Sequence, residues 1–131
     1  MSDAELSKIL YVEDDPDIQI VAKMALEAVG GYVLHVCSSG QEAITHGADF
    51  APDLILLDVM MPDMDGPTTL KNLRMIPSLI STPAVFMTAK VMPSDVERYK
   101  ELGAVDVIAK PFDPMTLATR IHEIWSQHHG G

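Results

Sequence analysis

Apolar residues along the chain gather in five short runs, and the segments between the runs have a different spacing. Short apolar runs with turn signals at their ends are typical of strands that are buried on both faces. The pattern therefore predicts five strands. They cover residues 9–12, 32–37, 54–58, 83–87 and 106–109.

The segments between these strands carry apolar residues three and four positions apart, which is the spacing of one helix face. Ser39–Glu42 and Ser94–Glu97 each have the spacing of a capping box at a helix start. Five helices are predicted. They cover residues 17–29, a short segment from residue 39, residues 67–76, residues 94–102 and a segment that begins after Asp113-Pro114.

Strands and helices that alternate in this way call for a parallel sheet with helices on both faces. No hairpin turn signal separates any two of the strands, which argues against an antiparallel arrangement. We expect an α/β fold that forms one domain over residues 1–131, with loose tails at residues 1–7 and 127–131.

Composition and charge narrow the possible partners. The 131-residue chain has a formal net charge of -10 and a sequence pI of about 4.6. This balance argues against a nucleic-acid partner, because little would neutralise phosphates, and it suits a basic or amphipathic protein. Cys37 is the only cysteine, so there is no internal disulfide and no thiolate metal site. The sequence has no signal peptide and no apolar run long enough for a membrane span, and we expect a cytoplasmic protein.

Polar residues collect where the predicted strands end. Glu13 and Asp14 follow the first strand, Asp58 ends the third, Thr88 follows the fourth and Lys110 follows the fifth. In a parallel sheet these ends share one edge, where open α/β sheets bind their ligands. We therefore expect three carboxylates, one hydroxyl and one ammonium group to converge at a single site.

Three carboxylates at close range repel one another, and a hard divalent cation would relieve that repulsion. A set of oxygen ligands without Cys or His favours Mg²⁺, for which Mn²⁺ can substitute. Lys110 and Thr88 would then hold the oxygens of a phosphoryl group, and Asp58 could be the nucleophile that forms an aspartyl-phosphate.

Four motifs in register give the chain a family resemblance over nearly its whole length. It resembles the receiver domains of two-component response regulators, in particular the stand-alone, chemotaxis-regulator type. The start at Met1 and the short segment after the last helix favour the stand-alone form. The motifs are Glu13-Asp14-Asp15-Pro16, Asp58-Val-Met-Met-Pro-Asp-Met-Asp-Gly66, Thr88-Ala89 and Lys110-Pro111-Phe112.

The resemblance implies a flavodoxin-like, doubly wound fold with five parallel strands in the order 2-1-3-4-5 and five helices. It also implies that Asp58 accepts a phosphoryl group from a histidine kinase or a phosphotransfer protein. Phosphorylation would change the face formed by the fourth helix, the fifth strand and the fifth helix, and so control an output partner protein. Such a domain is no enzyme toward other molecules, since it catalyses only its own phosphorylation and dephosphorylation.

The resemblance further implies a metal site made of Glu13, Asp14, Asp58 and the backbone carbonyl of Met60. Most receivers carry Asp at the first of these positions. Because Glu13 is longer, we expect it to reach the ion through a water molecule.

By the same resemblance, Lys110 pairs with a phosphoryl oxygen, and the Lys110–Pro111 peptide bond is cis. The Thr88 hydroxyl would move toward the phosphoryl group and take the following loop with it.

One position departs from the family pattern. Many receivers carry Tyr or Phe three residues before the lysine, where this chain has Val107. A valine has no ring to fill the space that Thr88 vacates, so we expect a muted or differently routed conformational change. Lys90 and Met60 border the path of attacking water, and we expect them to tune the lifetime of the phosphoryl group.

Two other functions compete with this interpretation. Asp63-Met-Asp65-Gly66 offers the Asp-x-Asp pattern of a haloacid-dehalogenase-type phosphatase, but it follows a proline turn instead of ending the first strand. The chain also lacks room for a substrate cap. A receiver-like interaction module that is never phosphorylated would be consistent with Val107, although the intact acids, Thr88 and Lys110 argue against it.

Overall fold

A computed structural model describes residues 5–128 and confirms the alternation of strands and helices. All five strands pair in parallel within one sheet, in the order β2-β1-β3-β4-β5, as the resemblance implies. The strands are β1 (Lys8–Val12), β2 (Val33–Cys37), β3 (Leu54–Asp58), β4 (Ala84–Thr88) and β5 (Asp106–Ala109).

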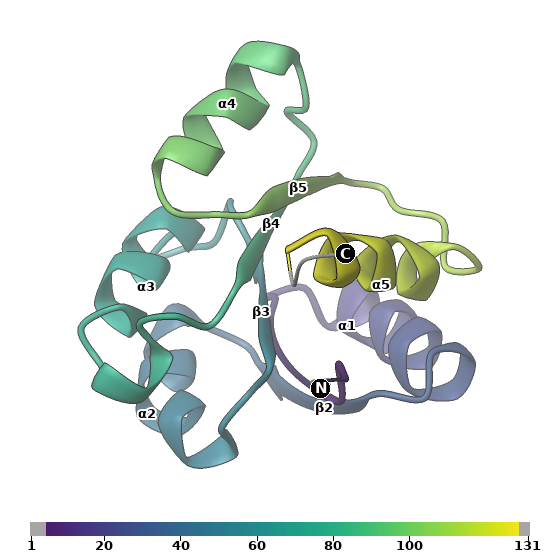
Figure 1. The fold of residues 1–131 in the computed structure, drawn as a ribbon, viewed down its shortest axis with the longest axis horizontal. Coiled ribbons are helices and arrows are strands. Elements are labelled where there is room, and N and C mark those ends of the chain that lie inside the picture. Colours follow the sequence, from purple (N-terminus) through teal and green to yellow (C-terminus); the bar gives the residue numbers. More distant parts are fainter. Residues whose placement is uncertain (1–4, 129–131) are drawn as a thin grey trace.

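Five α-helices connect and cover the strands. Figure 1 shows α1 and α5 on one side of the sheet and α2 and α3 on the other, with α4 beside the β5 edge. The helices are α1 (Pro16–Lys23), α2 (Gly40–Phe50), α3 (Gly66–Leu73), α4 (Pro93–Glu101) and α5 (Leu117–His128). A π-helical segment, η1 (Met24–Val29), and a 3₁₀ turn, η2 (Pro77–Leu79), complete the set.

The sheet separates two hydrophobic cores. Ile9 and Tyr11 pack with α1 and α5, whereas the intervening Leu10 packs with α2 and α3. This alternation follows from the two-residue period of a strand. Every residue of β3 and β4 is buried, as expected for a parallel sheet covered on both faces.

The first helix differs from the prediction of one α-helix over residues 17–29. It is α-helical only to Lys23 and continues as the π-helical segment η1. The wider turn is visible in the bond from the Gly30 N–H to the Ala25 carbonyl, 3.1 Å. It brings Gly30 against α5, where a Cβ on residue 30 would lie 2.8 Å from the Ala118 Cβ. This turn holds one residue more than an α-helical turn, which the spacing of apolar residues along the sequence does not reveal.

Helix starts agree with the sequence at α2 and differ at α4. The Ser39 hydroxyl accepts the Glu42 N–H at 3.1 Å, as the first capping box predicts. The predicted box at Ser94–Glu97 is wrong, because α4 already begins at Pro93. Proline is favoured at the first helical position, and the Asp95 carboxylate accepts the Met92 N–H at 3.2 Å.

Residues 6, 7, 127 and 128 differ from the prediction of loose tails. Leu6 is part of a core, and the Ser7 N–H donates to the Asp53 carboxylate at 3.0 Å. Residues 127 and 128 belong to α5. The prediction of loose tails is therefore corrected for these residues, while positions 1–4 and 129–131 lie outside the described residues. Within residues 5–128, no helix combines the length and apolar character needed to cross a membrane.

Candidate functional site

Two buried carboxylates lie side by side at the carboxyl edge of the sheet. Glu13 directly follows β1, and its N–H donates to the Cys37 carbonyl of β2 at 3.0 Å, which fixes its backbone. Asp58 is the last residue of β3. Their relative exposures are only 1% and 3%. Parallel pairing of β1 with β3 brings the two strand ends together, as the strand-end argument predicts.

Asp14 completes a cluster with these two acids. One carboxylate oxygen from each of Glu13, Asp14 and Asp58 lies within 4.8 Å of the others, and Asp14 is the most accessible of the three to solvent. Oxygen atoms at this spacing match the donors that Mg²⁺ and Mn²⁺ prefer. The cluster therefore fits the cation that the sequence predicts.

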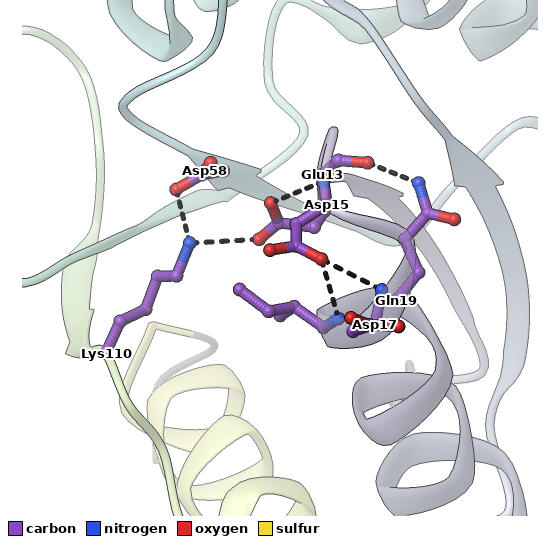
Figure 2. A network of polar contacts seen from close by, with 7 residues as sticks. Glu13, Asp15, Asp17, Gln19, Asp58 and Lys110 are labelled. Carbon is purple, nitrogen blue, oxygen red and sulfur yellow. Dashed lines mark hydrogen bonds and ion pairs between the residues drawn. The ribbon is translucent and has the colours of Figure 1, made fainter.

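Lys110 bridges the two buried acids. Its Nζ donates to Oε1 of Glu13 at 3.0 Å and to Oδ1 of Asp58 at 2.9 Å (Figure 2). Lys110 follows β5, and its N–H donates to the Thr88 carbonyl at 3.0 Å. The Lys110–Pro111 peptide bond is cis. In the described arrangement, the ammonium group thus supplies the positive charge closest to the two buried carboxylates.

The pKa values of Glu13 and Lys110 reflect their burial and their contacts with neighbouring groups. Removal from water raises the pKa of Glu13, and the Asp58 charge adds to the increase, whereas the Asp15 N–H and Lys110 oppose it. Burial alone would lower the pKa of Lys110, but its hydrogen bonds to Asp58 and Glu13 outweigh burial and raise it. The ionised lysine is therefore held in place by the acids, while burial makes the ionised form of Glu13 less favourable than in the unfolded chain.

The start of α1 fixes the loop that carries Glu13. Oε2 of Glu13 accepts the Asp15 N–H at 3.1 Å, and Asp15 in turn caps α1 by accepting the Asp17 N–H at 2.9 Å. The Gln19 side chain donates to the Glu13 carbonyl (Figure 2). It also donates to the Ser38 hydroxyl at 3.1 Å. The sequence interpretation did not single out Gln19. Its position one turn into α1 was the signal that could have identified it.

Thr88 lies at the same edge of the sheet and is 3% exposed. Its hydroxyl oxygen accepts the Lys90 N–H at 3.1 Å, so it is held by its own loop. The Lys90 side chain is exposed. The structure thus places Thr88 and Lys90 beside the strand ends and brings Glu13, Asp58 and Lys110 into direct contact.

The loop between β3 and α3 passes close to the backbone of Asp58. A Cβ on Gly66 would lie 2.4 Å from the Asp58 carbonyl oxygen, so only glycine fits without a shift. The Gly66 N–H donates to the Val59 carbonyl at 2.9 Å, which closes the loop. Met60 lies within the loop, and its side chain is 74% exposed.

Val107 is buried in the core on the α2–α3 side, with a relative exposure of 6%. Phe86 of β4 is its register partner, and the Phe86 and Tyr99 rings meet edge to face with centroids 5.3 Å apart. The aromatic volume beside Val107 therefore comes from neighbouring elements in place of a ring at position 107.

Tyr11 is a second residue that the sequence interpretation missed. It is fully buried on β1, and its hydroxyl is the one buried side-chain polar atom in residues 5–128 without a hydrogen-bond partner. Strand alternation was the available signal, because it places residues 11 and 13 on the same side of the sheet.

The Asp-x-Asp pattern of the phosphatase alternative has a structural role. The Asp65 carboxylate caps α3 by accepting the Thr68 N–H at 2.9 Å. Asp63 lies in the loop with a φ of 68°. Neither residue ends the first strand, where that alternative needs its nucleophile.

Comparisons with known proteins agree with this geometry. The model of the response regulator receiver domain family matches residues 9–122. The transcriptional regulatory protein CpxR of Escherichia coli (strain K12) is 39% identical over 124 residues, which are 95% of this chain and 51% of that protein. The alkaline phosphatase synthesis transcriptional regulatory protein PhoP of Bacillus subtilis (strain 168) is 38% identical over 117 residues, 89% of this chain and 48% of that protein. The chain thus spans about half the length of these two relatives.

A solved structure gives the same picture. The chemotaxis response regulator CheY4 of Vibrio cholerae superimposes with a TM-score of 0.84 at 29% sequence identity. The match covers 92% of this chain and 99% of that chain.

Proposed function

The chain belongs to the response regulator receiver domain family, and on that premise we propose that Asp58 is the phosphoacceptor of a two-component phosphorelay. One observation carries the proposal. The buried Asp58 carboxylate, at the carboxyl end of β3, touches the Lys110 ammonium and lies within a cluster of three acids. A carboxylate in this setting has a positive charge beside it that can stabilise a phosphoryl group, and it has neighbouring side chains that can position that group.

Phosphoryl transfer would proceed by attack of an Asp58 oxygen on the phosphorus of a phosphohistidine. Lys110 holds Oδ1, which leaves Oδ2 as the attacking oxygen. The new P–O bond forms as the P–N bond breaks, and the leaving imidazole nitrogen keeps the electron pair and takes a proton from solvent. Lys110 would then turn its ammonium group toward a phosphoryl oxygen.

Glu13, Asp14, Asp58 and the Met60 carbonyl would hold Mg²⁺ or Mn²⁺ in this scheme. When bound, the cation neutralises charge on the phosphoryl oxygens. The longer side chain of Glu13 would reach it through a water molecule. The carboxylates of Glu13 and Asp58 would have to exchange part of their bonding to Lys110 for bonding to the cation.

The response would pass from Thr88 to the face formed by α4, β5 and α5. The Thr88 hydroxyl would exchange its bond from the Lys90 N–H for one to the phosphoryl group and draw the β4–α4 loop inward. Because Phe86 and Tyr99 fill the space near Val107, the change would be muted or differently routed compared with receivers that carry an aromatic residue there. Lys90 and Met60 would tune phosphoryl lifetime.

A histidine kinase or a phosphotransfer protein would supply the phosphoryl group, and an output protein would read the altered face. The net charge of -10 supports a protein partner over nucleic acid for this chain. The domain would act as a signalling switch, with catalysis limited to its own phosphorylation and dephosphorylation.

Intact-mass measurement after incubation with acetyl phosphate tests this proposal. We expect the native protein to gain one phosphoryl group in Mg²⁺ and none in EDTA, and Asp58→Asn to gain none in either. Asp53→Asn is the matched control, because Asp53 lies just before the opposite end of β3 and accepts backbone N–H groups of residues 7 and 8. No gain by the native protein in Mg²⁺ would favour an interaction module that is not phosphorylated.

A further inference from the structure

Tyr11 places a phenol beneath the acid cluster. It lies in the middle of β1, between Val36 of β2 and Leu56 of β3, and has a relative exposure of 0%. Strand alternation puts its side chain on the α1–α5 side of the sheet, the side that Glu13 shares two residues later. The ring belongs to the core, and the hydroxyl is close enough to Glu13 and Asp58 to be affected by their charges.

The Tyr11 hydroxyl lies close to the acids, and its contact with Glu13 falls short of hydrogen-bond geometry. A phenol keeps its proton at neutral pH, so the Tyr11 hydroxyl is a donor, and the carboxylates of Glu13 and Asp58 are charged groups close to it. Yet the hydroxyl has no hydrogen-bond partner of ordinary geometry among residues 5–128. A buried donor that lacks a hydrogen-bond partner is destabilising. A phenylalanine would fill the same space without that cost.

Glu13 explains why the donor is unpaired in this arrangement. Its Oε1 accepts from Lys110 and its Oε2 from the Asp15 N–H (Figure 2). Both carboxylate oxygens of Glu13 therefore already accept from other donors. If Glu13 turned toward a cation and released Lys110, the same carboxylate would become the nearest acceptor for the hydroxyl.

We propose that Tyr11 is a positioning residue for the divalent cation, whose hydroxyl donates to the Glu13 carboxylate once Glu13 exchanges Lys110 for the ion. This inference rests on the proposed function, because it takes the acid cluster as the cation site. A hydrogen bond to a carboxylate that holds a cation, directly or through a water molecule, orients that carboxylate, and loss of such a bond typically weakens metal binding about 10- to 100-fold. The unpaired donor of the metal-free state would thereby be satisfied in the metal-bound state.

The experiment compares the native protein with Tyr11→Phe and with Tyr99→Phe, a matched change at a buried tyrosine in the other core. Mg²⁺ affinity is measured by calorimetry, Mn²⁺ affinity by electron paramagnetic resonance, and stability by urea unfolding in EDTA. We expect Tyr11→Phe to weaken both metals about tenfold with unchanged or higher stability in EDTA. Tyr99→Phe should keep native affinity. A cation-dependent tyrosine absorbance change should be present in the native protein and in Tyr99→Phe, and absent from Tyr11→Phe.

Each alternative result has a distinct meaning. If the native protein binds neither cation, the proposed function fails and this inference fails with it. If the native protein binds and Tyr11→Phe binds equally well, the role of Tyr11 is refuted while the proposed function stands. If Tyr11→Phe loses affinity and EDTA stability together, the phenol has only a structural role, and the inference is overturned.

Discussion

Replacing Asp58 by Asn should leave the metal-free protein as stable as the native protein or make it more stable. The reason is the charge balance at this buried carboxylate. Asp58 has one favourable charged neighbour, Lys110 at 2.9 Å, and two unfavourable ones, Glu13 and Asp14. Asparagine keeps nearly the same shape and removes the charge, and Lys110 retains its bond to Glu13.

The distances set the size of the expected effect. With an effective dielectric constant of about 20, unit charges 2.9 Å apart attract by about 6 kcal/mol, and each pair of like charges within 4.8 Å repels by at least about 3.5 kcal/mol. The two repulsions therefore amount to at least about 7 kcal/mol and exceed the attraction by about 1 kcal/mol or more. Burial of the charge at 3% exposure adds a further cost. We expect the free energy of unfolding to rise by about 0–2 kcal/mol in EDTA.

Urea unfolding in EDTA and in Mg²⁺ measures both sides of this balance. At a Mg²⁺ concentration of about ten times its dissociation constant, the native protein should gain about 1.4 kcal/mol. Asp58→Asn loses one ligand and should gain far less. The difference in the free energy of unfolding between Asp58→Asn and the native protein should therefore narrow or change sign between EDTA and Mg²⁺.

Asp53→Asn is the control for replacing a carboxylate by an amide outside the acid cluster. Asp53 accepts the Ser7 and Lys8 N–H groups at 3.0 and 2.9 Å, so its substitution should cost about 1 kcal/mol with or without the cation. If Asp58→Asn were less stable than the native protein in EDTA by more than about 1 kcal/mol, the attraction to Lys110 would outweigh the repulsions, and the reasoning would be refuted.

Three further predictions concern the loops around the site. Gly66→Ala should lower the free energy of unfolding by about 2–3 kcal/mol in thermal denaturation, because its Cβ would lie 2.4 Å from the Asp58 carbonyl oxygen; an unchanged melting temperature would contradict this. The raised pKa of Glu13 means that the folded state binds its proton more tightly than the unfolded chain. Native stability in EDTA should therefore fall as pH rises from about 4.5 through the folded pKa of Glu13, and the fall should be missing from Glu13→Gln. Thr88→Val removes the acceptor of the Lys90 N–H, so amide exchange at residue 90 should accelerate about tenfold, whereas equal rates would show that this bond does not protect the loop.

The position of the site was predictable because it depends on topology. In a parallel sheet the carboxyl ends of all strands share one edge, so Asp58, Thr88 and Lys110 had to lie near one another once the strands were identified. The bonds they make were not predictable in the same way. Lys110 is predicted to pair with a phosphoryl oxygen once Asp58 is phosphorylated, and in the described state its ammonium group bridges Glu13 and Asp58. That choice depends on local charge and burial, which a sequence pattern does not contain.

Two features that the sequence interpretation missed have local physical causes. Gln19 reaches across to the Glu13 carbonyl from α1, a contact that depends on the entry angle of the helix and not on residue spacing. The π-helical segment arises where Ala25 and Leu26 are both buried and Gly30 lies against Ala118. An α-helical period fits the same apolar residues equally well, so tertiary packing decides between the two.

The burial of β3 on both faces has a consequence for how the chain finds its correct alignment during folding. Residues 54–57 are all leucine or isoleucine and all 0% exposed, so a slip by one position would exchange similar side chains between the two cores at little hydrophobic cost. Asp58 would then point to the α2–α3 side, away from Lys110, as an uncompensated buried charge. The residue proposed to receive the phosphoryl group therefore also selects one strand alignment over its near-degenerate neighbour, and its conversion to an apolar residue would remove that selection along with the chemistry.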